Sequence, residues 1–118
     1  MWPGVIYQHI LIFNFMADNC CGENSKKMQE ILKLREFLRI ISDTNRLRIL
    51  CLLTKKELCV CKIFKALQLP QNLVSHHLAK LEKMALVEKR KKGTFIIYSI
   101  NKKVLGEYKI LFNQIIKD

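Results

Sequence analysis

The sequence predicts a mostly α-helical domain that carries one small β-hairpin near its C-terminal end. Three observations support this fold class: apolar residues recur at helical spacing in several segments, a proline separates two short helical segments, and a β-branched and aromatic run follows a glycine turn. The chain has 118 residues, half of them hydrophobic. That is enough for one compact domain with a single core.

Two longer helices open the domain. Ser25 is placed to cap a helix that runs to about residue 41, and Ser42 or Asp43 is placed to cap the second. The expected apolar positions of these two helices are Met28, Ile31, Leu34, Leu38 and Ile41, then Leu47, Ile49, Leu50, Leu52 and Leu53. Cys51 lies within the second helix, where we expect a small buried apolar residue.

Two shorter helices on either side of Pro70 form a helix-turn-helix pattern. The first runs from about residue 58 to 67, with Ile63 and Leu67 toward the core. Pro70 suits the first position of the second, because its missing N–H costs nothing there. This helix runs to about residue 84, and its expected inward residues are Val74, Leu78, Leu81 and Ala85.

A hairpin with a basic tip follows directly, so the pattern as a whole is that of a winged helix. Residues 86–90 form the first expected strand and residues 91–94 the turn, where Gly93 is free to take a positive φ. Residues 95–100 form the second strand, with Ile96, Tyr98 and Ile100 on one face.

The last helix spans about residues 102–116 and has a broad apolar stripe. The stripe comprises Val104, Leu105, Tyr108, Leu111, Phe112, Ile115 and Ile116. A terminal helix this apolar needs a partner surface. Either it packs on its own domain, or it pairs with the first helix across the two-fold axis of a dimer.

The charge pattern indicates a polyanionic partner. The net charge is +11. Residues 71–103 contain eight basic and two acidic side chains, a net +6 that is over half the excess. A generally lysine-rich soluble surface is the alternative, but the clustering favours nucleic acid.

The five cysteines, Cys20, Cys21, Cys51, Cys59 and Cys61, indicate a reduced compartment. Their number is odd and no secretory signal precedes them, so we expect a cytoplasmic protein without a disulfide scaffold or a membrane span. Residues 1–24 form an N-terminal arm ahead of a domain at 25–118. The apolar residues 1–15 are expected either to precede a true start at Met16 or to add a helix or strand.

The segment Glu57-Leu58-Cys59-Val60-Cys61 carries the chemistry. Side chains that face each other on a helix lie about three or four residues apart, so a metal ion held by both thiols would require the helix start to distort. Thiolates bind zinc, cadmium, lead, trivalent arsenic or cuprous copper. A helix N-terminus and nearby lysines favour the thiolate form. The alternative is a pair of half-buried core residues.

These motifs resemble the ArsR/SmtB family of winged-helix metal-responsive repressors. The resemblance covers residues 34–103 and rests on three runs: residues 42–50, the thiol box at 57–61, and the recognition-helix run at 74–81, with Gly93 and Tyr98 in the wing. It implies a homodimer that binds double-stranded operator DNA when metal-free and releases it when a soft metal or metalloid ion binds. No cofactor is then needed for DNA binding.

The chain departs from the family pattern at the metal box. The arsenic-sensing branch has an aspartate and a third cysteine where this chain has Lys62 and Phe64. A cadmium-, lead- and zinc-sensing branch adds cysteines from its arm, so Cys20 and Cys21 are candidates to complete a site with Cys59 and Cys61. No histidine follows His77, which makes the family's last-helix site improbable.

The resemblance also divides the DNA contacts. Base edges are assigned to Gln71, Asn72, Ser75 and His76, and phosphates to Lys80, Lys89, Arg90, Lys91 and Lys92. Of the adjacent histidines, one is expected to face DNA and the other to pack. We therefore expect a metal-released repressor. The alternative is a thiol-redox-gated or metal-independent regulator. We do not expect an enzyme, since no acid/base set or phosphate loop is present.

Overall fold

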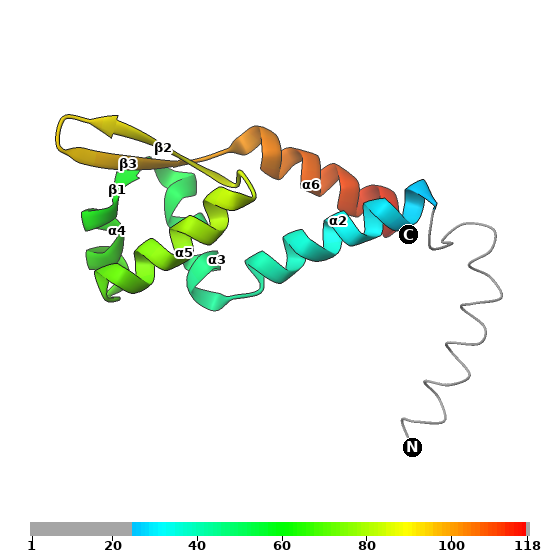
Figure 1. Cartoon of the computed structure of the whole chain (residues 1–118), viewed down its shortest axis with the longest axis horizontal. Helices are drawn as coiled ribbons and strands as arrows, with labels where there is room; N and C mark the ends of the chain where they lie inside the picture. The colour runs from blue at the N-terminus through cyan, green and yellow to red at the C-terminus, as the bar shows by residue number, and fades with distance from the viewer. Residues whose placement is uncertain (1–24, 118) are drawn as a thin grey trace, which may run out of the picture.

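Figure 1 shows the computed structural model, which describes residues 25–117. Its elements in chain order are α2 (Lys26–Ile41), α3 (Thr44–Lys55), β1 (Leu58–Cys59), α4 (Val60–Leu67), α5 (Gln71–Lys83), β2 (Val87–Lys92), β3 (Phe95–Ile100) and α6 (Lys102–Ile115). The expected winged helix-turn-helix is confirmed. None of the helices within residues 25–117 combines the length and apolarity that a membrane crossing requires.

Short polar side chains start the two longer helices, as expected. The backbone N–H of Met28 donates to Ser25 Oγ at 3.0 Å. Asp43, rather than Ser42, caps α3, because its Oδ1 accepts the N–H groups of Asn45 at 2.9 Å and Arg46 at 3.1 Å. These bonds satisfy N–H groups that have no partner within a helix.

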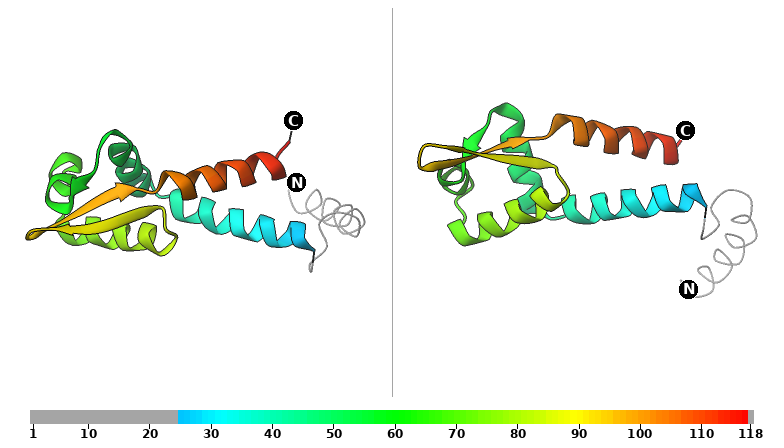
Figure 2. Two further views of the ribbon diagram at one scale, coloured as in Figure 1. Left: turned by 90° about the horizontal axis from the view of Figure 1, so that it is seen from above. Right: turned by 45° about the horizontal axis from the view of Figure 1, so that its top comes forward.

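Helices α2 and α6 lie side by side and project from the end of the domain opposite the tip of the wing (Figure 2). Their contact is centred on Phe37 and Tyr108, whose rings stack with centroids 4.3 Å apart. Phe37 is buried, whereas Leu38, which belongs to the predicted apolar stripe of this helix, is 41% exposed. The reason is the partner: packing on α6 turns the buried face of α2 toward Leu34 and Phe37.

Helix α3 lies at the centre of the core through three apolar side chains, Ile49, Leu50 and Leu53. Leu47, one of the apolar residues noted on this helix, is 46% exposed and lies outside the core. The predicted burial of Cys51 is wrong, because this thiol is exposed. Each step along a helix turns the side chain by about 100°, and Cys51 therefore points away from the face that Leu50 presents to the core.

Both helices of the helix-turn-helix end in a tight backbone turn. Gln68 follows α4 with φ +55°, and Ala85 follows α5 with φ +57°. After α5, the N–H of Ala85 donates to Glu82 O at 2.9 Å and the N–H of Leu86 to Leu81 O at 3.0 Å. This left-handed ending directs the chain into the wing. It also explains why Ala85 is exposed, contrary to expectation. Pro70 precedes α5 as its N-cap, one position earlier than expected.

The wing belongs to a three-stranded antiparallel sheet with the order β1-β3-β2. Lys92 pairs with Phe95, so the turn is Gly93-Thr94, with Gly93 at φ +62°. Lys91 and Lys92, expected in the turn, lie at the end of β2 instead. The sequence did not predict β1, whose Leu58 and Cys59 pair with Tyr98 and Ile97 of β3.

Replacing Ala85 with glycine should stabilise the fold, because glycine adopts a positive φ without the clash that a Cβ atom creates. The free energy of unfolding should rise by about 0.5–1 kcal/mol, which is the left-handed penalty less the greater entropy of glycine in the unfolded chain. Denaturation by urea measures the change.

Ala79 supplies the matched control, since it is an exposed alanine inside α5. Ala79→Gly should lower the free energy of unfolding by about 0.5–1 kcal/mol. A loss of stability in both variants would contradict this account of the α5 ending.

Candidate nucleic-acid interface and thiol site

Helix α5 has one buried face and one exposed polar face. Val74, Leu78 and Leu81 are fully buried in the core. The exposed residues of the opposite face include all four candidates for base contacts: Gln71, Asn72, Ser75 and His76. The polar residues at the start of this recognition helix are therefore open to solvent, and Lys80 is half-buried further along it.

His77 is the buried member of the histidine pair and lies between α5 and α3. Its Nε2 is 3.9 Å from Asp43 Oδ1, and its Nδ1 has no hydrogen-bond partner among the described residues. Burial lowers the pKa of His77, while the nearby Asp43 carboxylate opposes that shift. The hydrogen bond from the Arg46 N–H lowers the pKa of Asp43. The cap of α3 therefore also lies against the recognition helix.

The basic residues of β2 fall into two groups. Lys89 lies 3.5 Å from Glu82 Oε1, and Arg90 forms an ion pair with Glu57. Lys91 and Lys92 are exposed near the wing tip, and neither forms an ion pair within residues 25–117. The two tip lysines are thus free for phosphate contacts, whereas Lys89 and Arg90 are engaged by acidic side chains.

The two sulfurs of the thiol box come together without a distorted helix. Cys59 lies in β1 and serves as the N-cap of α4, with extended φ −71° and ψ 157°, and Cys61 lies in the first turn of α4. Their Cα atoms are 5.4 Å apart and the sulfurs are joined in a disulfide. The expected distortion of the helix start is therefore wrong, because the first cysteine lies outside the helix.

A hollow of about 570 Å³ gives access to the sulfurs between α4 and the outer face of the wing sheet. Its lining residues are Glu57, Leu58, Cys59, Cys61, Lys62, Lys65, Arg90, Lys92, Phe95 and Ile97. Four of these side chains are cationic. The sulfurs therefore lie beside a cluster of positive charge.

Within residues 25–117, no group of three or more His, Cys, Asp or Glu side chains could hold a metal ion. Cys59 and Cys61 supply two sulfurs, fewer than the three or four that a soft ion takes. The other two candidates, Cys20 and Cys21, lie outside the described residues. Cys51 is on α3 and does not join the pair.

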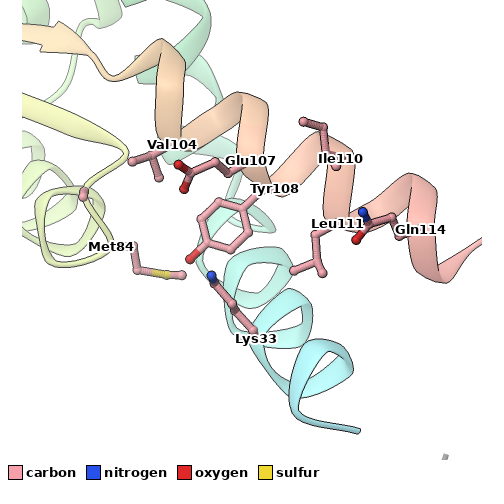
Figure 3. A pocket seen from close by; sticks show the side chains of 9 residues that line it. Lys33, Met84, Val104, Glu107, Tyr108, Ile110, Leu111 and Gln114 are labelled. Carbon is pink, nitrogen blue, oxygen red and sulfur yellow. The ribbon is translucent and has the colours of Figure 1, made fainter. Parts of the chain in front are cut away.

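A second hollow, of about 240 Å³, lies between α2, α6 and the end of α5. Figure 3 shows Lys33 of α2 beside Tyr108 and Met84, with Val104 and Leu111 on the α6 wall. Around this hollow, α2 and α6 expose Leu32, Leu38, Ile110 and Phe112, and Ile116 is exposed directly after α6. The two helices bury part of their apolar surface against each other and leave the rest uncovered.

A recognition helix with a polar outer face, followed by a basic two-stranded wing, defines a winged helix-turn-helix regulator that binds DNA. The model of bacterial regulatory proteins of the arsR family matches residues 43–89. An uncharacterized HTH-type transcriptional regulator of Methanocaldococcus jannaschii is 42% identical over 74 residues, which cover 62% of this chain and 83% of that protein. The chain belongs to the arsR family.

Two further proteins are similar over most of the winged helix. The arsenical resistance operon repressor of Staphylococcus aureus is 39% identical over 75 residues, covering 64% of this chain and 72% of that protein. The homodimeric winged helix-turn-helix DNA-binding domain of a possible ArsR-family regulator of Mycobacterium bovis superimposes with a TM-score of 0.63 at 26% identity. The superposition covers 77% of this chain and 85% of that domain.

Sequence reasoning missed the contacts that join these parts. Nothing in the local pattern of Glu57 indicates that it reaches Arg90, and nothing around Glu82 indicates Lys89. The burial of Phe37 could have been predicted, because Phe37 follows Leu34 at helical spacing.

Proposed function

We propose that this regulator is a homodimeric, cytoplasmic repressor that leaves its operator when a soft metal or metalloid ion binds Cys59 and Cys61. The inducer class is arsenite, cadmium, lead or zinc. The main observation that supports this proposal is the convergence of two sulfurs at the start of α4, the helix that precedes the recognition helix. The name of the S. aureus relative, an arsenical resistance operon repressor, is consistent with this class.

In this proposal the DNA contacts divide by chemistry. Gln71, Asn72, Ser75 and His76 contact base edges in the major groove, since they form the exposed face of α5. Lys80, Lys89, Arg90, Lys91 and Lys92 contact phosphates. The exposed Lys91 and Lys92 carry the larger share, because Lys89 and Arg90 must first separate from Glu82 and Glu57.

The dimer of this proposal forms through α2 and α6. In each copy these helices already pack through Phe37 and Tyr108, so they present one combined surface rather than two separate faces. The uncovered side chains of that surface include Ile110, which is 59% exposed, and Phe112. Burying such a patch against a second copy would stabilise the dimer.

The thiol chemistry needs reduced sulfurs. Cys59 and Cys61 bind an ion as thiolates, and Cys20 and Cys21 of the arm are the proposed further ligands. Because Cys59 pairs with β3 and Cys61 lies in the first turn of α4, any change in their separation acts on both the wing sheet and the helix-turn-helix. Neither thiol belongs to the exposed face of α5, so DNA binding itself does not require them.

The Cys59–Cys61 disulfide supports a second candidate, a regulator gated by thiol oxidation. Hydrogen peroxide would accept two electrons and two protons from the thiol pair, forming the disulfide and two molecules of water. Disulfide formation would act on the same backbone segment, from Cys59 to Cys61. Metal titration of the reduced protein and peroxide treatment of the metal-free protein separate the two candidates.

Replacing Lys91 and Lys92 with alanine should weaken binding to all duplexes alike, because phosphate contacts carry no base information. The slope of log affinity against log salt should flatten by up to about 2, at roughly 0.9 per phosphate contact. Fluorescence anisotropy at several salt concentrations measures the slope.

The control for this pair removes two equal charges elsewhere, with Lys109 in α6 and Lys117 after it replaced by alanine. Replacing Gln71 or Ser75 should instead change base preference, at about 1–3 kcal/mol for each lost contact. A changed preference from the lysine pair, with none from Gln71 and Ser75, would contradict the assignment.

Cys59→Ser and Cys61→Ser should leave operator binding intact and abolish release by metal, because either change removes one of the two local thiolates. Operator release from the reduced protein is measured with arsenite, cadmium, lead and zinc in turn, and then with peroxide. X-ray absorption on the loaded protein gives the number of sulfur ligands.

Cys51→Ser is the matched control and should behave as the wild type. Replacing Cys20 and Cys21 together should weaken ion binding and lower the sulfur count. Normal metal release in Cys59→Ser, or a bound ion with only nitrogen and oxygen neighbours, would refute the metal mechanism. Release by peroxide alone would favour the second candidate.

A further inference from the structure

We propose that Glu57, through its ion pair with Arg90, links the thiol pair to the DNA-binding wing. The inference rests on the proposed function, since it concerns how the same two thiols weaken DNA binding. Glu57 is not among the proposed DNA contacts or metal ligands. Its role is that of a positioning residue, and it acts on DNA only through Arg90.

The pairing of the sheet places the thiol and the arginine in one row. Cys59 lies opposite Ile97 of β3, and Ile97 lies opposite Arg90 of β2. Residues directly opposite one another in antiparallel strands project from the same face. Glu57 precedes Cys59 by two residues, the spacing that repeats on one face of an extended chain. All four residues line the 570 Å³ hollow.

The ion pair spans the middle strand of the sheet. Strand β3 lies between β1 and β2, so a contact from Glu57 to Arg90 joins the thiol segment to the strand on the far side of β3. The backbone link is short, because β1 has only two residues and its pairing reaches only Tyr98 and Ile97. The Glu57 carboxylate therefore connects the thiol segment to β2, the basic strand of the wing.

The ion pair also determines where the Arg90 guanidinium is held. Both side chains are about half exposed, at 51% for Arg90 and 47% for Glu57, so the pair contributes little to folding stability. Its effect is on geometry and charge, since a guanidinium on a carboxylate is not free to bind a phosphate. A shift of the backbone at Cys59 and Cys61 moves Glu57, and Arg90 moves with it.

The test measures the ratio of operator dissociation constants with and without saturating cadmium in the reduced protein. Absorption by the sulfur–cadmium charge-transfer band separately confirms that the ion is bound. Allosteric couplings commonly lie in the range of about 5- to 150-fold. We expect Glu57→Gln to bind cadmium as the wild type does. The ratio should nevertheless fall by at least about 5-fold, or to 1, the value at which cadmium has no effect on operator binding.

The double-mutant cycle separates the pair from a general loss of charge. Arg90→Gln should reduce the ratio as Glu57→Gln does, and the double variant should reduce it no further. Glu88→Gln is the matched control, because Glu88 is an exposed carboxylate on β2 that hydrogen-bonds to Asn101 and has no basic partner among the described residues. It should keep the wild-type ratio.

The outcomes distinguish this inference from the proposed function. A wild-type ratio in Glu57→Gln, additive effects in the double variant, or loss of cadmium binding in Glu57→Gln would each overturn the link and leave the thiol-gated repressor standing. A wild-type protein that binds no ion of the cadmium, arsenite, lead and zinc series, or binds one without release, would overturn both.

Discussion

The pairing of two residues, Leu58 and Cys59, with β3 ties the thiol box to the wing. It makes the segment before α4 a strand of the wing sheet. The same Cys59 is also the N-cap of α4, so one residue belongs to the sheet and to the helix-turn-helix at once. A chemical change at this residue cannot act on one without the other. The thiol box therefore lies at the junction between the two DNA-binding parts.

The recognition helix is held to the rest of the domain by a second junction. Three fully buried side chains of α5 lie in the core, and His77 lies against Asp43, the residue that starts α3. Burying a polar side chain that lacks a hydrogen bond is unfavourable, so the contact with a carboxylate that is itself fixed by two backbone N–H groups restricts how α5 sits on α3. The outer face of α5 then has a defined orientation relative to the wing.

The sequence predicted the features that depend on local chemistry. Ser25 as a cap, Gly93 as the turn glycine and the polar outer face of α5 follow from capping, backbone sterics and helical spacing. Each needs only residues within a few positions along the chain. The exposed base-contact candidates were therefore predictable as surface residues, and their roles on DNA remain predictions.

The parts that sequence reasoning missed depend on partners distant in the chain. Strand β1 forms because β3 offers a free edge, and no pattern within two residues specifies that. Leu38 and Phe37 both fit a helical stripe, and it is Phe37 that stacks on the ring of Tyr108 from α6. Cys51 was expected to be buried from residue type alone, yet its position on α3 turns it outward. The Glu57–Arg90 ion pair likewise requires the fold to bring both side chains to one face.

Hydrogen exchange of the reduced protein, measured with and without a bound soft ion, tests most directly whether the thiol pair acts on the wing through the sheet. Ion binding at Cys59 and Cys61 should change the protection of backbone amides in β3 and β2 as well as at the start of α4. Changes confined to α4 and α5, with the wing strands unaffected, would contradict this action through the sheet.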